Sequence, residues 1–353
     1  MASSLFPPEP DTDVHSGMLT PSSAALTDPF HDHSRTTTSY SESERGPPSL
    51  NYIMTSARKR SLFITVGTII FLNIALPTII FYAAKYGIHP RLKPVDYYTA
   101  ASAALGALQL PQVPYRFWCL LKQNGRRSPL LPDGNRTGFW WALRRNDTFQ
   151  VGFLIGTILG IAVLVVATSV NGADGYFPLL VLMPAIIFGY IGLALLAVTA
   201  LSQSATIVQP ARFSIVPKGE PFRPALFYVW EDLVGCDGGG GNAFRNALDR
   251  RYRQSPPFRR MLLTLSWLIA YSLTGLCIVA FIITYALYGD SSSHGKYEDA
   301  SWAANFVLLT LWLGLTAYVG IKHGLDSMRA EEIWWADKPS LDRLPESRDH
   351  LVS

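Results

Sequence analysis

The chain has 353 residues, of which 49% are hydrophobic and only 16% are charged, and its formal net charge is +4. Soluble globular proteins carry about 25% charged residues, so this sequence lacks the polar surface that a soluble protein needs. Six stretches of 19 to 37 residues contain no Asp, Glu, Lys or Arg. Because uncharged apolar stretches of about 18 or more residues are typical of transmembrane helices, the sequence predicts an all-α, multi-pass membrane protein.

The N-terminal residues 1–57 are predicted to be a disordered tail. Ser, Thr and Pro make up 23 of the first 50 residues, and no apolar periodicity is present. Such a segment cannot bury enough apolar surface to offset the conformational entropy that ordering would cost.

Residues 58–322 are predicted to form a membrane domain of six transmembrane helices, followed by a cytoplasmic tail at 323–353. The second helix has the weakest signal, since it is rich in Ala and Gly and carries Gln109 and Gln112. Two longer hydrophilic loops, 116–147 and 203–260, interrupt the domain. The six spans cover about 61–84, 97–115, 150–172, 176–201, 262–288 and 301–321.

Three glycines of the third span, Gly152, Gly156 and Gly160, recur every four residues and therefore share one helix face. Small residues with this spacing let neighbouring transmembrane helices approach closely. We expect this face to be a helix-packing surface.

The basic residues predict the orientation of the chain. If all six spans cross with both termini in the cytoplasm, 26 of the 30 Lys and Arg residues lie on the cytoplasmic side, as the positive-inside rule requires. Without the weak second span, the basic residues at 58–60 and those of loop 116–147 would lie on opposite sides. Both termini are therefore predicted to be cytoplasmic, in the plasma membrane or an endomembrane.

Two glycosylation sequons, at Asn135 and Asn146, test this orientation. Glycans are added only on the lumenal side, whereas both residues belong to a loop predicted to be cytoplasmic. We expect both to be unmodified, and a glycan on either would reverse the topology.

No charged residue lies inside the predicted spans. Proton relays and ion pathways usually need intramembrane charges, so an ion-coupled transporter is disfavoured. Asn73 and Asn305 are expected to hydrogen-bond between helices. A small-molecule facilitator remains open, and it should show a polar cavity between the first, second and fourth spans.

The acidic residues of loop 203–260 offer one functional hypothesis. Glu231, Asp232 and Asp237 could hold a divalent cation in a membrane-bound enzyme that acts on a lipid or isoprenoid diphosphate, since Mg²⁺ prefers oxygen ligands. However, neighbouring side chains at 231 and 232 point apart on a helix, and no metal site or cofactor is predicted. The glycine run 238–241 reads as a flexible hinge.

The basic residues of the same loop offer the favoured hypothesis. A predicted helix at 242–254 carries an apolar stripe of Phe244, Leu248 and Tyr252. Such a helix can lie on the cytoplasmic leaflet, where basic side chains bind anionic headgroups. The predicted membrane-binding residues are Arg245, Arg250, Arg251, Arg253, Arg259 and Arg260. Loop 116–147 is also basic and aromatic, and next to membrane spans this favours the bilayer interface over nucleic acid as its partner.

Several short motifs lie at 57–61, 116–118, 221–225, 228, 231–232, 237–241, 244–245, 251–252, 255–256 and 258–261. Together they resemble those of a large group of multi-pass membrane proteins from filamentous fungi. The resemblance covers about residues 55–325 and implies a shared topology, but no catalytic residue or cofactor. Some members of such groups belong to secondary-metabolite pathways, which suggests an accessory role there. We expect a non-enzymatic accessory or scaffold protein that acts through the basic loops 116–147 and 203–260.

Overall fold

A computed structural model describes residues 46–50, 71, 75–88, 94–107, 114, 118, 148–170, 175–204, 206–209, 215–288 and 294–341. Most of these residues form helices, and among them the only β-type pairing is one bridge between Val208 and Pro221. Most of the predicted tail, much of the first span, the end of the second span and nearly all of loop 116–147 lie outside the described residues. The sequons at Asn135 and Asn146 lie outside them too.

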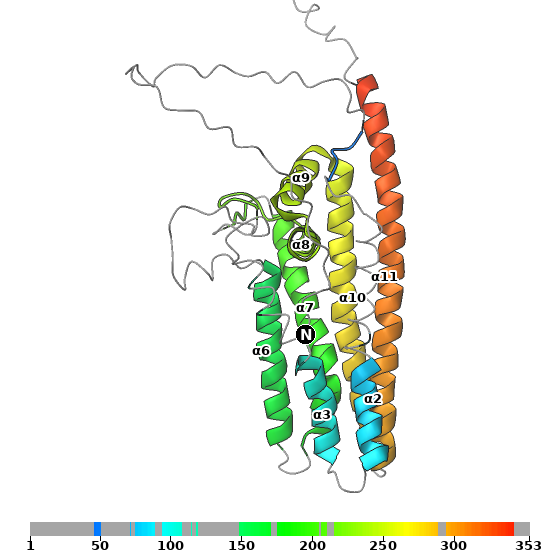
Figure 1. The fold of residues 1–353 in the computed structure, drawn as a ribbon. Coiled ribbons are helices and arrows are strands. Elements are labelled where there is room, and N and C mark those ends of the chain that lie inside the picture. The colour runs from blue at the N-terminus through cyan, green and yellow to red at the C-terminus, as the bar shows by residue number, and fades with distance from the viewer. Residues whose placement is uncertain are drawn as a thin grey trace, which may run out of the picture. The chain divides into compact units, whose positions relative to one another are not determined.

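Four helices are long and apolar enough to cross a membrane, which confirms a helical protein with several candidate spans. They are α6 (Thr148–Ser169), α7 (Phe177–Gln203), α10 (Pro256–Tyr288) and α11 (His294–Leu341), and they run alongside one another (Figure 1). The described parts of the first two predicted spans are α2 (Leu76–Tyr82), continued by the π-helix η2 (Ala83–Ile88), and α3 (Pro94–Ala107).

The last two helices are longer than hydropathy predicted. Helix α10 begins at Pro256, where the Ser255 hydroxyl accepts a hydrogen bond from the Phe258 N–H at 3.3 Å and so caps the helix. Helix α11 continues to Leu341, because residues 325–337 contain no Gly or Pro and include good helix formers. At 1.5 Å per residue α11 is about 72 Å long, more than twice the thickness of a bilayer's hydrocarbon core.

The closest helix contact joins α7 to α10. A Cβ atom added to Gly189 would lie 2.6 Å from Cys277 Sγ, and one added to Gly192 would lie 2.7 Å from the backbone nitrogen of Thr274. Any larger side chain at these two positions would force the helices apart. Helix α6 packs on another face of α7, where a Cβ on Gly156 would meet Tyr190 at 3.4 Å and one on Gly160 would meet Ile187 at 3.3 Å.

A proline inside α7 creates a polar contact with α3. Pro184 has no N–H, so the carbonyl of Leu180 lacks its usual partner within the helix. The Ser102 hydroxyl of α3 donates to this carbonyl at 3.4 Å. An unpaired carbonyl in a bilayer is costly, so this contact helps to hold α3 against α7.

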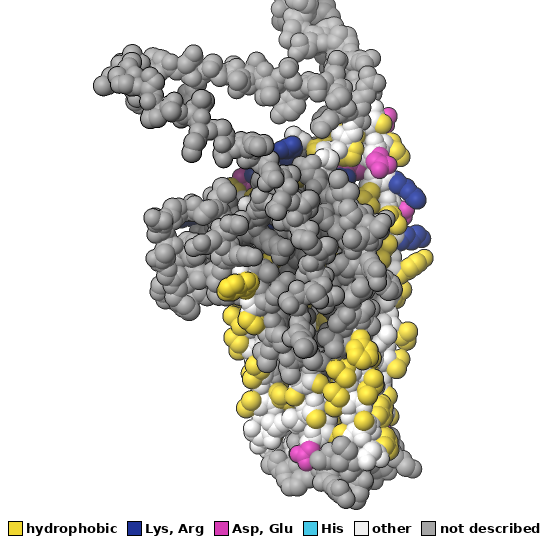
Figure 2. All heavy atoms as spheres, viewed as in Figure 1, with side chains coloured by type: hydrophobic (Ala, Val, Ile, Leu, Met, Phe, Trp, Pro, Cys, Tyr) yellow, Lys and Arg dark blue, Asp and Glu magenta, His cyan; other side chains and the backbone are white. Residues whose placement is uncertain are grey.

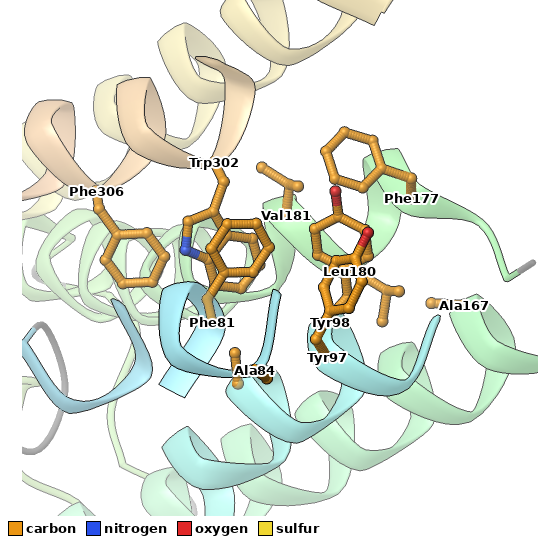
Figure 3. Close-up of a cluster of buried hydrophobic side chains, with 11 residues drawn as sticks. Phe81, Ala84, Tyr97, Tyr98, Ala167, Phe177, Leu180, Val181, Trp302 and Phe306 are labelled. Atoms are coloured by element: carbon orange, nitrogen blue, oxygen red, sulfur yellow. The ribbon is translucent and has the colours of Figure 1, made fainter. Parts of the chain in front are cut away.

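An aromatic cluster joins the three helical hairpins at one end of the bundle (Figure 3). Phe81 of α2 stacks on Trp302 of α11, with 4.6 Å between ring centroids and 13° between ring planes. Lys85 of η2 forms an ion pair with Asp299 of α11. Tyr98 of α3 and Phe177 of α7 complete the contact between hairpins.

Inside the bundle, Asn305 fulfils the expected interhelical role. Its amide nitrogen donates to the Thr284 hydroxyl of α10 and to the Ser301 carbonyl, both at 2.9 Å. Asn305 also borders a small pocket between α7, α10 and α11 whose other lining residues are apolar. This pocket does not match the polar cavity between the first, second and fourth spans that a facilitator should show. Asn73 lies outside the described residues.

Candidate functional site

Residues 206–209 and 215–255 form a folded unit, here called the loop module, between the ends of α7 and α10. It contains α8 (Ala225–Asp232), the π-helix η4 (Leu233–Asp237) and α9 (Gly241–Gln254). Helix α9 matches the helix expected at 242–254. Helix α8 contacts α6, α7 and α10, so the module is packed onto the bundle (Figure 1).

The apolar stripe of α9 faces protein. Phe244 and Leu248 are buried in a hydrophobic cluster with Phe227 of α8 and Leu262 of α10. The Tyr252 ring contacts Phe227, with ring centroids 5.2 Å apart. The prediction that this stripe enters the leaflet is wrong, because α8 and α10 cover it.

At the centre of the module, one arginine holds two carboxylates. Arg245 Nη1 donates to Glu231 Oε1 and to Asp232 Oδ1, both at 2.9 Å, and all three side chains are fully buried. The Ile215 N–H also donates to Glu231 Oε1, at 3.0 Å. Burial opposes the charge on Arg245, but the charges of Asp232 and Glu231 outweigh it and raise the pKa of the guanidinium.

This arrangement changes how three predicted site residues are understood. Arg245 was grouped with the lipid-binding residues, but its guanidinium is buried and cannot reach a headgroup. Glu231 and Asp232 were expected to point apart, yet they converge on the same nitrogen and tie α8 to α9. Asp237 is the last residue of η4, and its side chain lies outside the described part of the chain.

The glycine run 238–241 forms a tight turn between η4 and α9. Gly239 and Gly241 have φ values of 68° and 56°, a left-handed conformation that few other residues adopt. The N–H groups of Gly238 and Gly240 donate to the carbonyls of Leu233 and Val234 at 2.8 and 2.9 Å. The run that resembled a hinge is therefore a hydrogen-bonded turn that sets the direction of α9.

A second charged cluster holds α9 to the segment before α8. The Arg223 guanidinium lies over the rings of Phe227 and Tyr252, 4.7 Å from each centroid, and forms ion pairs with Asp249 and Glu220. Arg253 donates to Glu220 at 2.7 Å and to Asp249 at 2.9 Å. Burial alone would raise the pKa of Glu220, but hydrogen bonds from Arg253 and Arg223 outweigh burial and lower it.

The six arginines predicted to bind the membrane therefore divide into two groups. Arg245, Arg251 and Arg253 form ion pairs with acidic residues, although Arg253 remains half exposed. Arg250, Arg259 and Arg260 are exposed and form no ion pair with any described residue. Charged side chains gather at the loop-module end, while the described helix surface below is largely hydrophobic (Figure 2).

Sequence reasoning missed the residues that hold the module in place. Arg223 stood within the resembling motif at 221–225 but was assigned no role, and Glu331 lies in α11, far along the chain from its partner Arg251. Gly189 and Gly192 could have been found, since residues three apart share one helix face and small residues on a face of an apolar span let helices approach closely. Within the described ranges, no three or more His, Cys, Asp and Glu side chains are grouped so that they could hold a metal ion.

Comparison with known proteins identifies the family of this chain. No curated protein and no solved structure matches the chain. A family model matches residues 35–333, which include all the helices described above except the last residues of α11. The chain therefore belongs to the family described as a domain of unknown function, DUF8766.

Proposed function

We propose that the chain is a membrane protein with six transmembrane helices and both termini in the cytoplasm. The described ends of the first two spans support this count. Phe81 and Tyr98, which flank the turn between α2 and α3, pack against Phe177 after the α6–α7 turn and Trp302 in α11. Three hairpins that turn at one end leave the loop module, with its basic residues, at the other.

Membrane-impermeant thiol labelling tests this topology. In a chain without native cysteines, Gly172→Cys reports on the connection between α6 and α7, and Ser292→Cys reports on the connection between α10 and α11. Lys218→Cys reports on the loop module. We expect labelling of positions 172 and 292 only from the non-cytoplasmic side, and of position 218 only from the cytoplasmic side. A glycan on Asn135 or Asn146, or the reverse labelling pattern, would contradict the proposal.

We further propose a non-enzymatic accessory role, in which the loop module is a scaffold held at the anionic cytoplasmic leaflet. One observation carries this proposal: the described acidic side chains of the module form ion pairs within it, while Arg250, Arg259 and Arg260 are exposed without an acidic partner among the described residues. Basic residues next to an anionic leaflet each add about 1 kcal/mol of attraction. The resemblance to fungal membrane proteins suggests a secondary-metabolite pathway as the setting.

Lipid retention tests the scaffold proposal. The purified chain is placed in nanodiscs of phosphatidylcholine and phosphatidylserine, and the lipids that remain bound after detergent extraction are counted by native mass spectrometry. We expect enrichment of phosphatidylserine, which is lost when Arg250, Arg259 and Arg260 are all changed to Gln. The matched control changes the exposed residues Lys218, Lys322 and Arg329 to Gln and should retain the enrichment.

Two outcomes would contradict this function. Equal lipid retention by the two triple variants would show that Arg250, Arg259 and Arg260 have no special role in lipid binding. Turnover of an isoprenoid diphosphate by the purified chain, abolished by Asp237→Asn at a normal membrane level, would establish the enzyme alternative instead.

A further inference from the structure

The first turns of α10 combine an exposed arginine with two stacked aromatic rings. Trp267 and Tyr271 lie one helical turn apart, with ring centroids 5.1 Å apart and ring planes inclined by only 17°. The Tyr271 side chain is 59% exposed. The pair therefore presents a flat aromatic surface on the outside of the bundle.

Helical periodicity places Arg260 on the same face as this pair. Seven and eleven residues separate Arg260 from Trp267 and Tyr271, which is close to two and three complete turns at 3.6 residues per turn. Exposed Thr264 lies between them on the same face. At 1.5 Å per residue, Trp267 lies about 10 Å and Tyr271 about 16 Å along the helix from Arg260.

These separations match the layers of one leaflet. Tyr285 lies near the opposite end of α10, and a hydrocarbon core of about 30 Å requires about 20 residues of helix. Counting back from Tyr285 puts the boundary of the core near residue 265. Arg260 then lies at the level of lipid phosphates, Trp267 at the glycerol esters and Tyr271 beside the first part of the acyl chains.

The hydrogen-bonding groups on this face suit the same ligand. Arg260 forms no ion pair with a described residue, and the Trp267 N–H and Tyr271 O–H donate to no other described residue. Buried or interfacial Trp and Tyr usually find a partner for these donors. A phosphate oxygen can pair with the guanidinium, and an ester carbonyl can accept from the Trp267 N–H.

We propose that the loop-module end of α10 binds one anionic glycerophospholipid, with its phosphate on Arg260, its ester region against Trp267 and the first part of an acyl chain against Tyr271. The choice of the cytoplasmic leaflet rests on the proposed function, whereas the site itself does not. Of the exposed arginines, this site assigns the lipid phosphate to Arg260, which shares a face of α10 with the aromatic pair. Arg250 lies on α9 and is not part of the site.

Photo-crosslinking in nanodiscs tests the site. Phosphatidylserine with a photoreactive group near the glycerol end of one acyl chain is compared with the same probe built on phosphatidylcholine, and adducts are mapped by mass spectrometry. We expect phosphatidylserine adducts on residues 264–271. Arg260→Gln should lower their yield about fivefold at limiting probe, the loss expected for one basic residue near an anionic surface.

The controls separate this site from general attraction. Arg329→Gln removes an exposed charge from α11 and should leave the yield unchanged, and Trp267→Leu with Tyr271→Leu should lower the yield without changing its dependence on salt. Size-exclusion profiles verify that each variant is folded. Equal labelling by both probes, or equal effects of Arg260→Gln and Arg329→Gln, overturns the proposal. If only the triple arginine variant loses phosphatidylserine, the scaffold function stands and the α10 site does not.

Discussion

The Glu331 carboxylate of α11 accepts two hydrogen bonds from the Arg251 guanidinium of α9, from Nε at 3.0 Å and from Nη2 at 2.6 Å. Glu331 is only 1% exposed, and Arg251 also lies over the Phe258 ring at 4.9 Å. Such paired hydrogen bonds between a guanidinium and a carboxylate are strong and directional. The contact fixes the C-terminal part of α11 to the loop module.

Breaking this pair should destabilise the junction of module and helix. Glu331→Gln removes one charge and leaves Arg251 mostly buried without its partner, a change that typically costs about 3–5 kcal/mol. We expect a clear fall in Tm in detergent, and protease cleavage near residues 322–341 at lower enzyme concentration.

An exposed pair on the same helix provides the control. Arg329 and Asp326 lie 3.7 Å apart with both side chains mostly exposed, and such surface pairs contribute about 0–1 kcal/mol. Asp326→Asn should therefore leave Tm nearly unchanged. Equal effects of the two substitutions would mean that the Arg251–Glu331 contact does not stabilise the chain.

The second prediction concerns the buried cluster of Arg245. Arg245→Met leaves Glu231 and Asp232 as two adjacent buried carboxylates, and the expected loss is again about 3–5 kcal/mol. Adding Glu231→Gln and Asp232→Asn to the same chain should recover part of that stability, because no uncompensated charge remains. Thermal unfolding of the single and triple variants measures this difference. A triple variant less stable than Arg245→Met would contradict a purely structural role for the carboxylates.

The third prediction concerns the glycines between α7 and α10. Gly192→Ala puts a Cβ 2.7 Å from a backbone atom of α10, which cannot move aside, and overpacking of this kind costs about 1–3 kcal/mol. Gly152→Ala is the matched control, since a Cβ there meets nothing within 4 Å and Ala favours helix. Fluorescence-detected size exclusion after heating should show loss of folded chain only for Gly192→Ala. If both variants stayed folded after heating, the close contact between Gly192 and α10 would be contradicted.

The fourth prediction is a double-mutant cycle at the proline of α7. Ser102→Ala leaves the Leu180 carbonyl without a donor and should cost up to about 1 kcal/mol. In a Pro184→Ala background, residue 184 supplies its own N–H to that carbonyl, so the same Ser102→Ala change should cost much less. Tm values of the four chains give the coupling. Additive effects would show that Ser102 does not compensate for the proline.

Several local features could be predicted because they depend on residues close together in the chain. The apolar runs predicted α6, α7, α10 and the membrane part of α11, and the pattern at 242–254 predicted α9. The ends of α10 and α11 could not be predicted from hydropathy. Hydropathy detects contact with lipid, whereas a helix continues wherever its backbone hydrogen bonds and propensities allow.

The partners of the charged residues could not be predicted at all. Arg245, Arg251 and Arg260 are the same residue type within one short segment, and sequence treated them alike as ligands for lipid headgroups. The first is buried against Glu231 and Asp232, the second pairs with Glu331, and the third is exposed. This separation depends on which helix faces each arginine.

By itself the sequence determined that this chain is helical and suited to a membrane, because long uncharged segments leave the backbone little alternative in lipid. The sequence also showed that its basic residues are concentrated in a few loops. Only the tertiary structure decided which of those charges are neutralised inside the loop module and which remain exposed. Ion pairs such as Arg251–Glu331 join residues distant in sequence, and only helix packing brings them within hydrogen-bonding distance.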